Sequence, residues 1–251
     1  MNATVDSLAR LLAQAFQAGK RIPIPPELQP ANRAAAYQIQ RELLDLLGET
    51  AAAWKVGTAP APETVWGSPL PQGCVRHSPA RLQRAPGSVF GLELEIAFRF
   101  ARTFPAGQLP DKDEDILAAL EAMALAVEVV STRYLGWPEV PDLLKLADLQ
   151  NHGALVLGEP MPYRADFPFL APRGALRLDG ADVSKQPMGN PAGDPRRLLA
   201  PFVRQCAARG LPVQREHWIT TGSYSGIHFV DHPGSAVAEL EGFPTLHLSF
   251  S

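Results

Sequence analysis

The stretch from Gly91 to Phe100 constrains the fold more than any other part of the chain, because its large apolar residues occur at every second position. One face of the stretch carries Leu92, Leu94, Ile96, Phe98 and Phe100. The other face carries Glu93, Glu95, Ala97 and Arg99. A period of two is the geometry of a β-strand, in which successive side chains point to opposite faces of the sheet. The pattern predicts a strand with an apolar face and a face that carries two carboxylates.

The chain around this strand predicts an α+β protein. From residue 51 onward, short apolar runs alternate with turn residues, and the 25 prolines and 20 glycines favour many short strands. Further strands are expected over 124–131, 154–157, 175–178, 218–221 and 246–250. Helical spacing and first-turn acids predict helices over 5–18, 32–47, 111–123 and 195–209. We therefore expect an N-terminal helical region over 1–50 and a β-rich domain over 51–251.

Charge and composition exclude several classes of protein. The net charge is −3 and no cluster of Lys and Arg stands out in the sequence, so a nucleic-acid partner is not expected. Two cysteines, Cys74 and Cys206, do not make a disulfide framework. The sequence has no apolar run of about 18 residues that would cross a membrane, and its first residues do not have the pattern of a signal peptide. We expect a cytoplasmic protein with no membrane partner.

Glu93 and Glu95 are the first candidate site residues. They lie two positions apart in the predicted strand, so their carboxylates project from one face within a few ångströms of each other. Two like charges at that separation need a cation or a proton between them. The same spacing also fits the solvent-exposed face of a half-buried sheet. The spacing alone leaves both interpretations open.

Glu128 is a third carboxylate, in the apolar run from Ala124 to Val130. An ionised carboxylate in such a setting is costly unless it is paired or binds a metal. A structural pair with Arg133 is the alternative interpretation. Three carboxylates without an accompanying set of Cys and His residues suit a hard cation with oxygen ligands, Mg²⁺ or Mn²⁺ rather than zinc.

Lys55 and the passage from Thr220 to Gly226 are further candidates. Lys55 lies beside Trp54 in an apolar setting, where partial desolvation lowers the pKa of a lysine and suits it to acid–base work. The alternative is a surface lysine with its ammonium in water. The hydroxyl-rich passage could present Thr221, Gly222 and backbone N–H groups to a carboxylate, or could form a tight turn.

Several short motifs follow one another along nearly the whole chain. They are Lys55-Val56-Gly57, Gly91–Phe98, Glu128, Ala147-Asp148, Val156-Leu157-Gly158, Gly189-Asn190-Pro191 and Thr221-Gly222-Ser223. In this order they resemble the 2-oxopent-4-enoate hydratase and 4-oxalocrotonate decarboxylase family, which belongs to the fumarylacetoacetate hydrolase superfamily.

The resemblance implies a mainly antiparallel, twisted β-roll with peripheral helices and an N-terminal helical region. It further implies an oligomer of at least two subunits and one Mg²⁺ or Mn²⁺ ion per site. The residues that it assigns are the metal ligands Glu93, Glu95 and Glu128, the catalytic Lys55, and the substrate-binding Thr221, Gly222, Ser223 and Asp148.

Glu128 also indicates a reaction, because hydrolases of the superfamily usually have Asp at the third ligand position, whereas hydratases and decarboxylases have Glu. The resemblance therefore implies a hydratase of aromatic compound catabolism that adds water to a 2-hydroxy-2,4-dienoic acid, such as 2-hydroxypenta-2,4-dienoate, to give a 4-hydroxy-2-oxo acid. The alternatives are a decarboxylase of a 4-oxalocrotonate-like acid and an acylpyruvate-type C–C hydrolase. Differences from the family pattern at Arg76-His77 and at 149–152 motivate one more: an inactive relative that binds 2-oxo acids.

Overall fold

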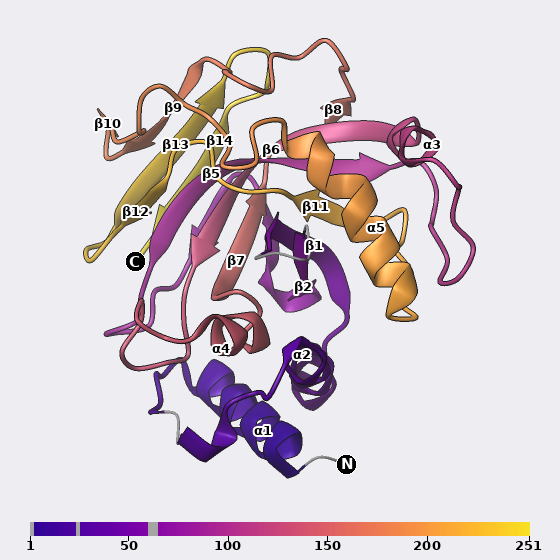
Figure 1. The fold of residues 1–251 in the computed structure, drawn as a ribbon. Helices are drawn as coiled ribbons and strands as arrows, with labels where there is room; N and C mark the ends of the chain where they lie inside the picture. Colours follow the sequence, from indigo (N-terminus) through magenta and orange to yellow (C-terminus); the bar gives the residue numbers. More distant parts are fainter. Residues whose placement is uncertain (1–2, 24–25, 60–64) are drawn as a thin grey trace.

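The computed structural model describes residues 3–23, 26–59 and 65–251 and consists of two β-sheets with helices outside them (Figure 1). The helices are α1 (Ala3–Ala18), α2 (Arg33–Leu47), α3 (Asp113–Leu117), α4 (Asp142–Ala147) and α5 (Leu199–Ala208). Short 3₁₀ turns occur at Pro26–Leu28, Gln72–Cys74 and Pro195–Leu198. None of the helices in these described ranges is both long and apolar enough to pass through a bilayer.

The larger sheet contains the strand that the alternation predicted. Its strands are β1 (Ala51–Thr58), β2 (Val65–Pro71), β3 (Val75–His77), β5 (Gly91–Phe100), β6 (Leu120–Val130), β7 (His152–Leu157), β8 (Met161–Pro162), β11 (Trp218–Thr220) and β12 (Ile227–Phe229). They run in the order β2-β1-β11-β5-β6-β7-β3, with β12 paired to β5 and β8 to β6.

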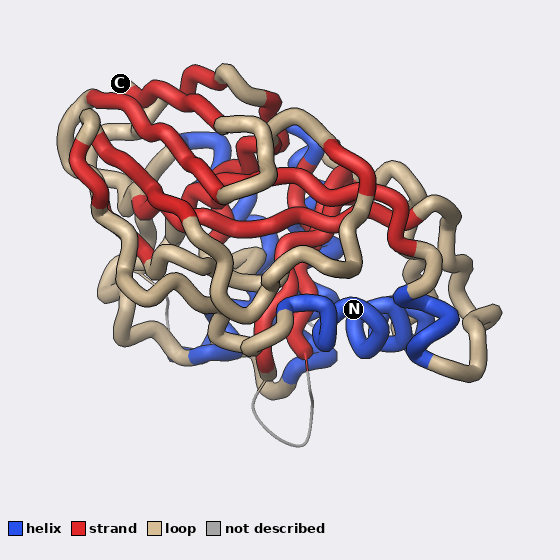
Figure 2. The backbone as a smooth tube through the Cα atoms, turned by 90° about the horizontal axis from the view of Figure 1, so that it is seen from above, coloured by secondary structure: helices blue, strands red, loops and turns tan. Residues whose placement is uncertain are grey.

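The smaller sheet contains β4 (Ala80–Leu82), β9 (Gly174–Leu178), β10 (Ala181–Asp182), β13 (Gly234–Leu240) and β14 (Leu246–Phe250). Its order is β10-β9-β13-β14-β4. Most pairings in the two sheets are antiparallel, whereas β1–β11, β3–β7 and β14–β4 are parallel. Figure 2, seen from above, shows the strands gathered in the body of the molecule. The expected α+β class with mainly antiparallel sheets is confirmed.

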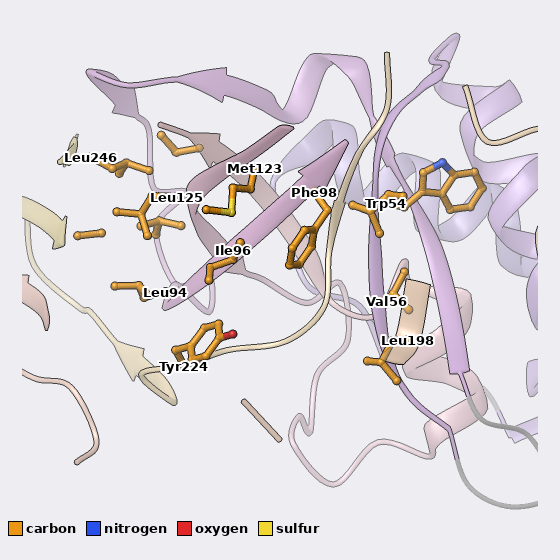
Figure 3. Close-up of a cluster of buried hydrophobic side chains, with 14 of the residues drawn as sticks. Trp54, Val56, Leu94, Ile96, Phe98, Met123, Leu125, Leu198, Tyr224 and Leu246 are labelled. Carbon is orange, nitrogen blue, oxygen red and sulfur yellow. The ribbon is translucent and has the colours of Figure 1, made fainter. Parts of the chain in front are cut away.

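The apolar face of β5 forms the centre of the main core. Its leucine, isoleucine and phenylalanine side chains are at most 1% exposed and pack with Met123 and Leu125 of β6 and with Leu246 of the smaller sheet (Figure 3). Burial of large aliphatic and aromatic side chains contributes about 1.5–3 kcal/mol each, so this layer is a major source of stability. Because the apolar face of β5 is buried in the main core, the opposite face, which carries Glu93 and Glu95, is turned away from that core.

The first two helices pack on each other at one end of the molecule (Figure 1). Helix α2 begins after Asn32, whose side chain accepts a hydrogen bond from the amide of Ala35, and it ends at Gly48 in the left-handed conformation, with φ +66°. Its apolar side packs with α1 and with α4, around Leu12, Ile39 and Leu144. The division of the chain near residue 50 stays a prediction.

The helix predicted over 111–123 is wrong beyond Leu117. Helix α3 covers only Asp113–Leu117, and β6 begins at Leu120. The residues from Leu120 to Met123 have good helix propensity, but Ala122 and Met123 pair with β5 on one side and with β8 on the other. Sheet pairing and burial outweigh a local preference of a few tenths of a kcal/mol per residue, about 0.7 at most for an ordinary residue.

Candidate metal and substrate site

Three glutamates meet on the face of β5 that is turned away from the main core. Glu93 lies directly opposite Glu128 in the antiparallel register of β5 and β6, and Glu95 lies two residues further along the same face. One carboxylate oxygen from each of the three residues lies within 4.8 Å of the others. Spacing in sequence predicted the first pair, and strand register adds the third residue.

This face of β5 is not a solvent-exposed outer face. Glu128 is 0% exposed and Glu95 is 1% exposed, while Glu93 is partly buried. The interpretation of these carboxylates as a solvated face of a half-buried sheet is therefore wrong. Both faces of β5 are covered, one by the main core and the other by the elements around the glutamates.

Lys55 joins the glutamates from a strand that is distant in the sheet. Its Nζ lies 2.7 Å from Oε1 of Glu128. Strands β1 and β6 are separated by β11 and β5, which in a flat sheet would place them about 14 Å apart at three strand spacings. The contact therefore requires a strongly curled sheet, with Lys55 on the concave side. Its side chain is only 17% exposed, so the surface-lysine interpretation is wrong.

The charges of the cluster shift the pKa of each member. Burial raises the pKa of Glu95 well above its ordinary value, and the charges of Glu128 and Glu93 raise it further. Burial also raises the pKa of Glu93. For Glu128, burial acts in the same direction, but Lys55 and His152 outweigh it and the pKa is lowered.

Lys55 differs from the expectation of a lowered pKa. Burial does lower the pKa of Lys55, but the negative charges of Glu128, Glu93 and Glu95 raise it by more, so the pKa lies above its ordinary value. The sequence showed the apolar neighbours of this lysine but not the three carboxylates that surround its ammonium.

The residues present fit a divalent metal ion. Oε2 of Glu128 is buried and has no hydrogen-bond partner among the described residues, so it is free to act as a ligand. With all three carboxylates ionised, as metal ligation requires, the cluster and the ammonium of Lys55 would carry a charge of about −2, which a divalent cation balances. Oxygen-only donors are the ligands of hard cations such as Mg²⁺ and Mn²⁺.

The segment after β11 closes over Glu95. The amide of Gly222 donates to Oε2 of Glu95 at 2.9 Å, so this N–H group is directed to a glutamate. Asn190 fixes the segment, because its Nδ2 donates to the carbonyl oxygens of Thr221 at 3.1 Å and Gly222 at 2.7 Å. Gly222 has a φ of +103°, which a residue with a side chain rarely adopts.

A cavity of about 600 Å³ opens beside the cluster. Its lining includes Lys55, Glu93, Glu95, Lys185 and the expected substrate residues Thr221, Gly222 and Ser223. The hydroxyl of Thr221 is buried and makes no hydrogen bond to any described residue, so it can bind a ligand oxygen. The volume is in the range of small-molecule sites, about 300–1,000 Å³.

Asp148 does not lie in this cavity. It is fully buried, and its Oδ1 pairs with Nε of Arg133 at 2.5 Å. Arg133 also donates to the carbonyl oxygens of His152 and Asp148 itself. The suggested pair between Glu128 and Arg133 is therefore wrong, and the expected substrate contact of Asp148 is replaced by a buried ion pair.

Two residues near the site were not among the sequence candidates. Nδ1 of the fully buried His152 lies 3.4 Å from Oε1 of Glu128. Nε2 of Gln150 donates to the carbonyl of Lys55 at 3.2 Å and to the hydroxyl of Ser68 at 2.9 Å. Both lie in the segment 149–152 that differs from the family pattern, and this difference was the only sequence signal for them.

A protein of known name aligns with nearly the whole chain. The chain is 26% identical over 258 residues to a 2-keto-4-pentenoate hydratase of Paraburkholderia phymatum, covering 98% of this chain and 97% of that protein. No family model matches the chain.

Solved structures agree in fold. The 4-oxalocrotonate decarboxylase of Pseudomonas putida G7, complexed with magnesium and adipate, has a TM-score of 0.86 at 18% identity, with 100% of this chain and 98% of that chain covered. The fumarylpyruvate hydrolase of Pseudomonas aeruginosa, in complex with Mn²⁺ and pyruvate, has a TM-score of 0.56 at 15% identity, with 79% of this chain and 88% of that chain covered. The chain is thus similar in sequence, over nearly its whole length, to a 2-keto-4-pentenoate hydratase, and it shares the fold of a 4-oxalocrotonate decarboxylase and a fumarylpyruvate hydrolase.

Proposed function

We propose that this protein is a divalent-metal-dependent hydratase of 2-hydroxy-2,4-dienoic acids. With 2-hydroxypenta-2,4-dienoate, one molecule of water adds and 4-hydroxy-2-oxopentanoate is formed. The observation that carries the proposal is the meeting of three carboxylates and Lys55 at one cavity. The named hydratase relative, aligned over almost its whole length, supports the substrate class.

Glu93, Glu95 and Glu128 would hold the metal, Mg²⁺ or Mn²⁺. When bound, this ion supplies Lewis-acid stabilisation of negative charge on the substrate carboxylate and its adjacent 2-oxygen. The protein positions the ligands through strand register and through the Gly222 amide, which fixes one oxygen of Glu95. Ordered ligands lower the reorganisation that the reaction requires.

Lys55 would move the proton in the first half of the reaction. The 2-hydroxyl loses a proton and C5 gains one, which converts the dienol to a conjugated 2-oxo-3-enoate. The hydroxyl group of a water molecule then adds at C4 and a proton adds at C3 as the water gives up its other hydrogen, so the atoms of one water molecule enter the product. Lys55 lines the cavity, so its ammonium group could donate the proton that C5 gains, and the neutral amine that remains could accept the proton of the 2-hydroxyl.

Thr221 and Ser223 would bind the substrate's oxygen atoms. Both line the cavity, and the Thr221 hydroxyl has no hydrogen-bond partner among the described residues. A hydroxyl that lacks a partner in the protein gains most from a ligand that supplies one. Asp148 has no part in this proposal.

Decarboxylation of a 4-oxalocrotonate-like acid is the second candidate. It is favoured by the TM-score of 0.86 to the decarboxylase from Pseudomonas putida G7. The conjugated 2-oxo group of the substrate, held in the same site, would accept the electron pair that is released when carbon dioxide leaves. Both reactions would use the same three metal-binding glutamates, so only the products distinguish a decarboxylase from a hydratase.

The experiment supplies purified protein with Mg²⁺ or Mn²⁺ and follows the ultraviolet absorbance of 2-hydroxypenta-2,4-dienoate and of 2-oxohex-3-enedioate. A 4-hydroxy-2-oxo acid identifies a hydratase, carbon dioxide a decarboxylase, and a carboxylic fragment a C–C hydrolase. Glu95→Gln should abolish metal-dependent turnover, with Glu121→Gln, on the neighbouring strand β6, as a matched control. Tight binding of oxalate with no turnover of any dienoate would instead identify the protein as an inactive relative that binds 2-oxo acids.

We further infer a cytoplasmic enzyme with at least two subunits. The exposed apolar side chains of Leu46, Leu135, Leu170 and Phe229 are available for subunit contacts. Sedimentation velocity would measure the number of subunits, and a monomer would contradict this inference.

A further inference from the structure

A second cavity lies apart from the glutamate cluster and is lined by basic side chains. It has a volume of about 410 Å³ and lies between the end of α1, the segment 73–90, and residues 129–133 and 153–154 of the larger sheet and its connections. Its basic lining residues are Lys20, Arg21, Arg76, Arg81, Arg84 and Arg133. The described lining contains no Asp or Glu.

Five of the six basic side chains form no ion pair with any described residue. The sixth, Arg133, is paired with Asp148. Arg76 and Arg84 each donate to one backbone carbonyl, of Val75 and Asp231 respectively. Nε of Arg84 is buried and has no partner within the described ranges. In a protein with a net charge of −3, five gathered cations produce a local positive potential that attracts anions.

The position of the basic residues is not explained by the fold alone. Lys20 and Arg21 follow the last residue of α1, where the helix dipole favours cations. Arg76, Arg81 and Arg84 come from β3, β4 and the segment after β4, and they have no such reason to face the same space. An anion that lies between them would reduce their mutual repulsion.

The cavity is distinct from the metal and substrate site. The two cavities share no lining residue. Val129 lines the basic cavity, whereas its neighbour Glu128 belongs to the glutamate cluster, because successive residues of a strand point to opposite faces of the sheet. A ligand in the basic cavity would therefore not touch the proposed reaction site.

We propose that this cavity binds a small multivalent anion that carries carboxylate or phosphate groups. Arginine guanidinium groups donate paired hydrogen bonds to such oxygens, and Ser88 and Ser131 in the lining add hydroxyl donors. Phe16, Leu82 and Phe90 provide apolar walls for a short carbon skeleton. The volume suits a metabolite rather than a polymer.

Isothermal titration calorimetry at low ionic strength, with inorganic phosphate, citrate and glutarate as probes, tests this proposal. Saturable binding is expected, with an affinity at least tenfold lower in the R76Q/R81Q variant. Both side chains are exposed and make no ion pair, so the variant should fold. The R102Q/R215Q variant has the same change of charge outside the cavity and should bind like the wild type. The E95Q variant, altered in the other cavity, should also bind like the wild type.

A preference for phosphate would identify a phosphorylated ligand, and a preference for citrate or glutarate a polycarboxylate; either result supports the site. Absence of saturable binding of all three probes would overturn the proposal, as would an equal loss of affinity in both double variants. A change of the sedimentation coefficient in R76Q/R81Q without a loss of anion affinity would also overturn it, because it would assign the cavity to a subunit contact.

Discussion

Nζ of Lys55 lies 2.7 Å from Oε1 of Glu128, although two strands separate β1 from β6 in the sheet. This contact connects the shape of the fold to its chemistry. The curl of the sheet brings a cation to three carboxylates, and the cation compensates one of their charges. The other two charges suit a divalent ion, and Lys55 remains at the wall of the cavity.

Replacing Lys55 by Met should separate catalysis from metal binding. The variant removes the proton carrier and one positive charge but keeps all three carboxylates. We expect turnover to fall by about 10²–10⁴-fold, the usual contribution of a general acid–base group. The affinity for Mn²⁺, measured by calorimetry, should stay the same or increase. Normal turnover in this variant would remove Lys55 from the mechanism.

Replacing His152 by Ala should weaken metal binding. Nδ1 of His152 lies 3.4 Å from Oε1 of Glu128, where it can orient the carboxylate group. Residues that orient a metal ligand typically change metal affinity by about 10–100-fold when they are removed. Calorimetry with Mn²⁺ on the folded variant checks this value. His247, an exposed histidine on β14, gives the control His247→Ala, which should bind as the wild type does.

Local patterns predicted much of the fold. The alternation of residues 91–100 located β5, and helical spacing located α1 and α2. Local preference was misleading in the segment after Asp111, where helix-forming residues pair as a strand. The curl of the sheet is a property of many strands together, so no local pattern contained it.

The candidate site was predictable to the extent that it depends on strand periodicity. Glu93 and Glu95 follow from a period of two, and Glu128 from its apolar neighbours. The opposition of Glu93 and Glu128 depends on register between strands. The partner of Glu128 was not predictable, because Arg133 is near in sequence whereas Lys55 is near only in space. His152 depends on the same long-range packing.

Substitution of Asp148 tests whether the Ala147-Asp148 motif stabilises the fold or binds substrate. Asp148→Ala leaves the buried guanidinium of Arg133 without its carboxylate, and we expect unfolding free energy to fall by about 3–5 kcal/mol. Urea denaturation measures the change. The double variant R133M/D148A should be less destabilised than the sum of the two single variants.

The exposed pair of Asp142 and Lys145 gives a matched control. Asp142→Ala should cost less than about 1 kcal/mol, since surface ion pairs contribute little. A higher KM in D148A with wild-type stability would instead support a substrate contact.

His217 should make stability depend on pH. Its Nδ1 accepts hydrogen bonds from Nε1 of Trp54 at 3.0 Å and from the amide of Gln214 at 3.2 Å. Burial lowers the pKa of His217 below its ordinary value of 6.5, with the bond to Ala51 opposing it only in part. The folded protein thus favours the neutral ring, whereas the unfolded chain takes up a proton at the higher pKa.

The stabilisation from neutral His217 is therefore complete above pH 6.5 and is lost as the pH falls through the lower pKa of the folded state. Asn at this position can offer an amide oxygen in place of Nδ1 and does not titrate. We expect the unfolding free energy of the wild type, measured in urea at pH 7.5 and 5.5, to decrease more than that of His217→Asn. Equal decreases in the two proteins would show that other groups cause the acid sensitivity, because the variant removes only this titration.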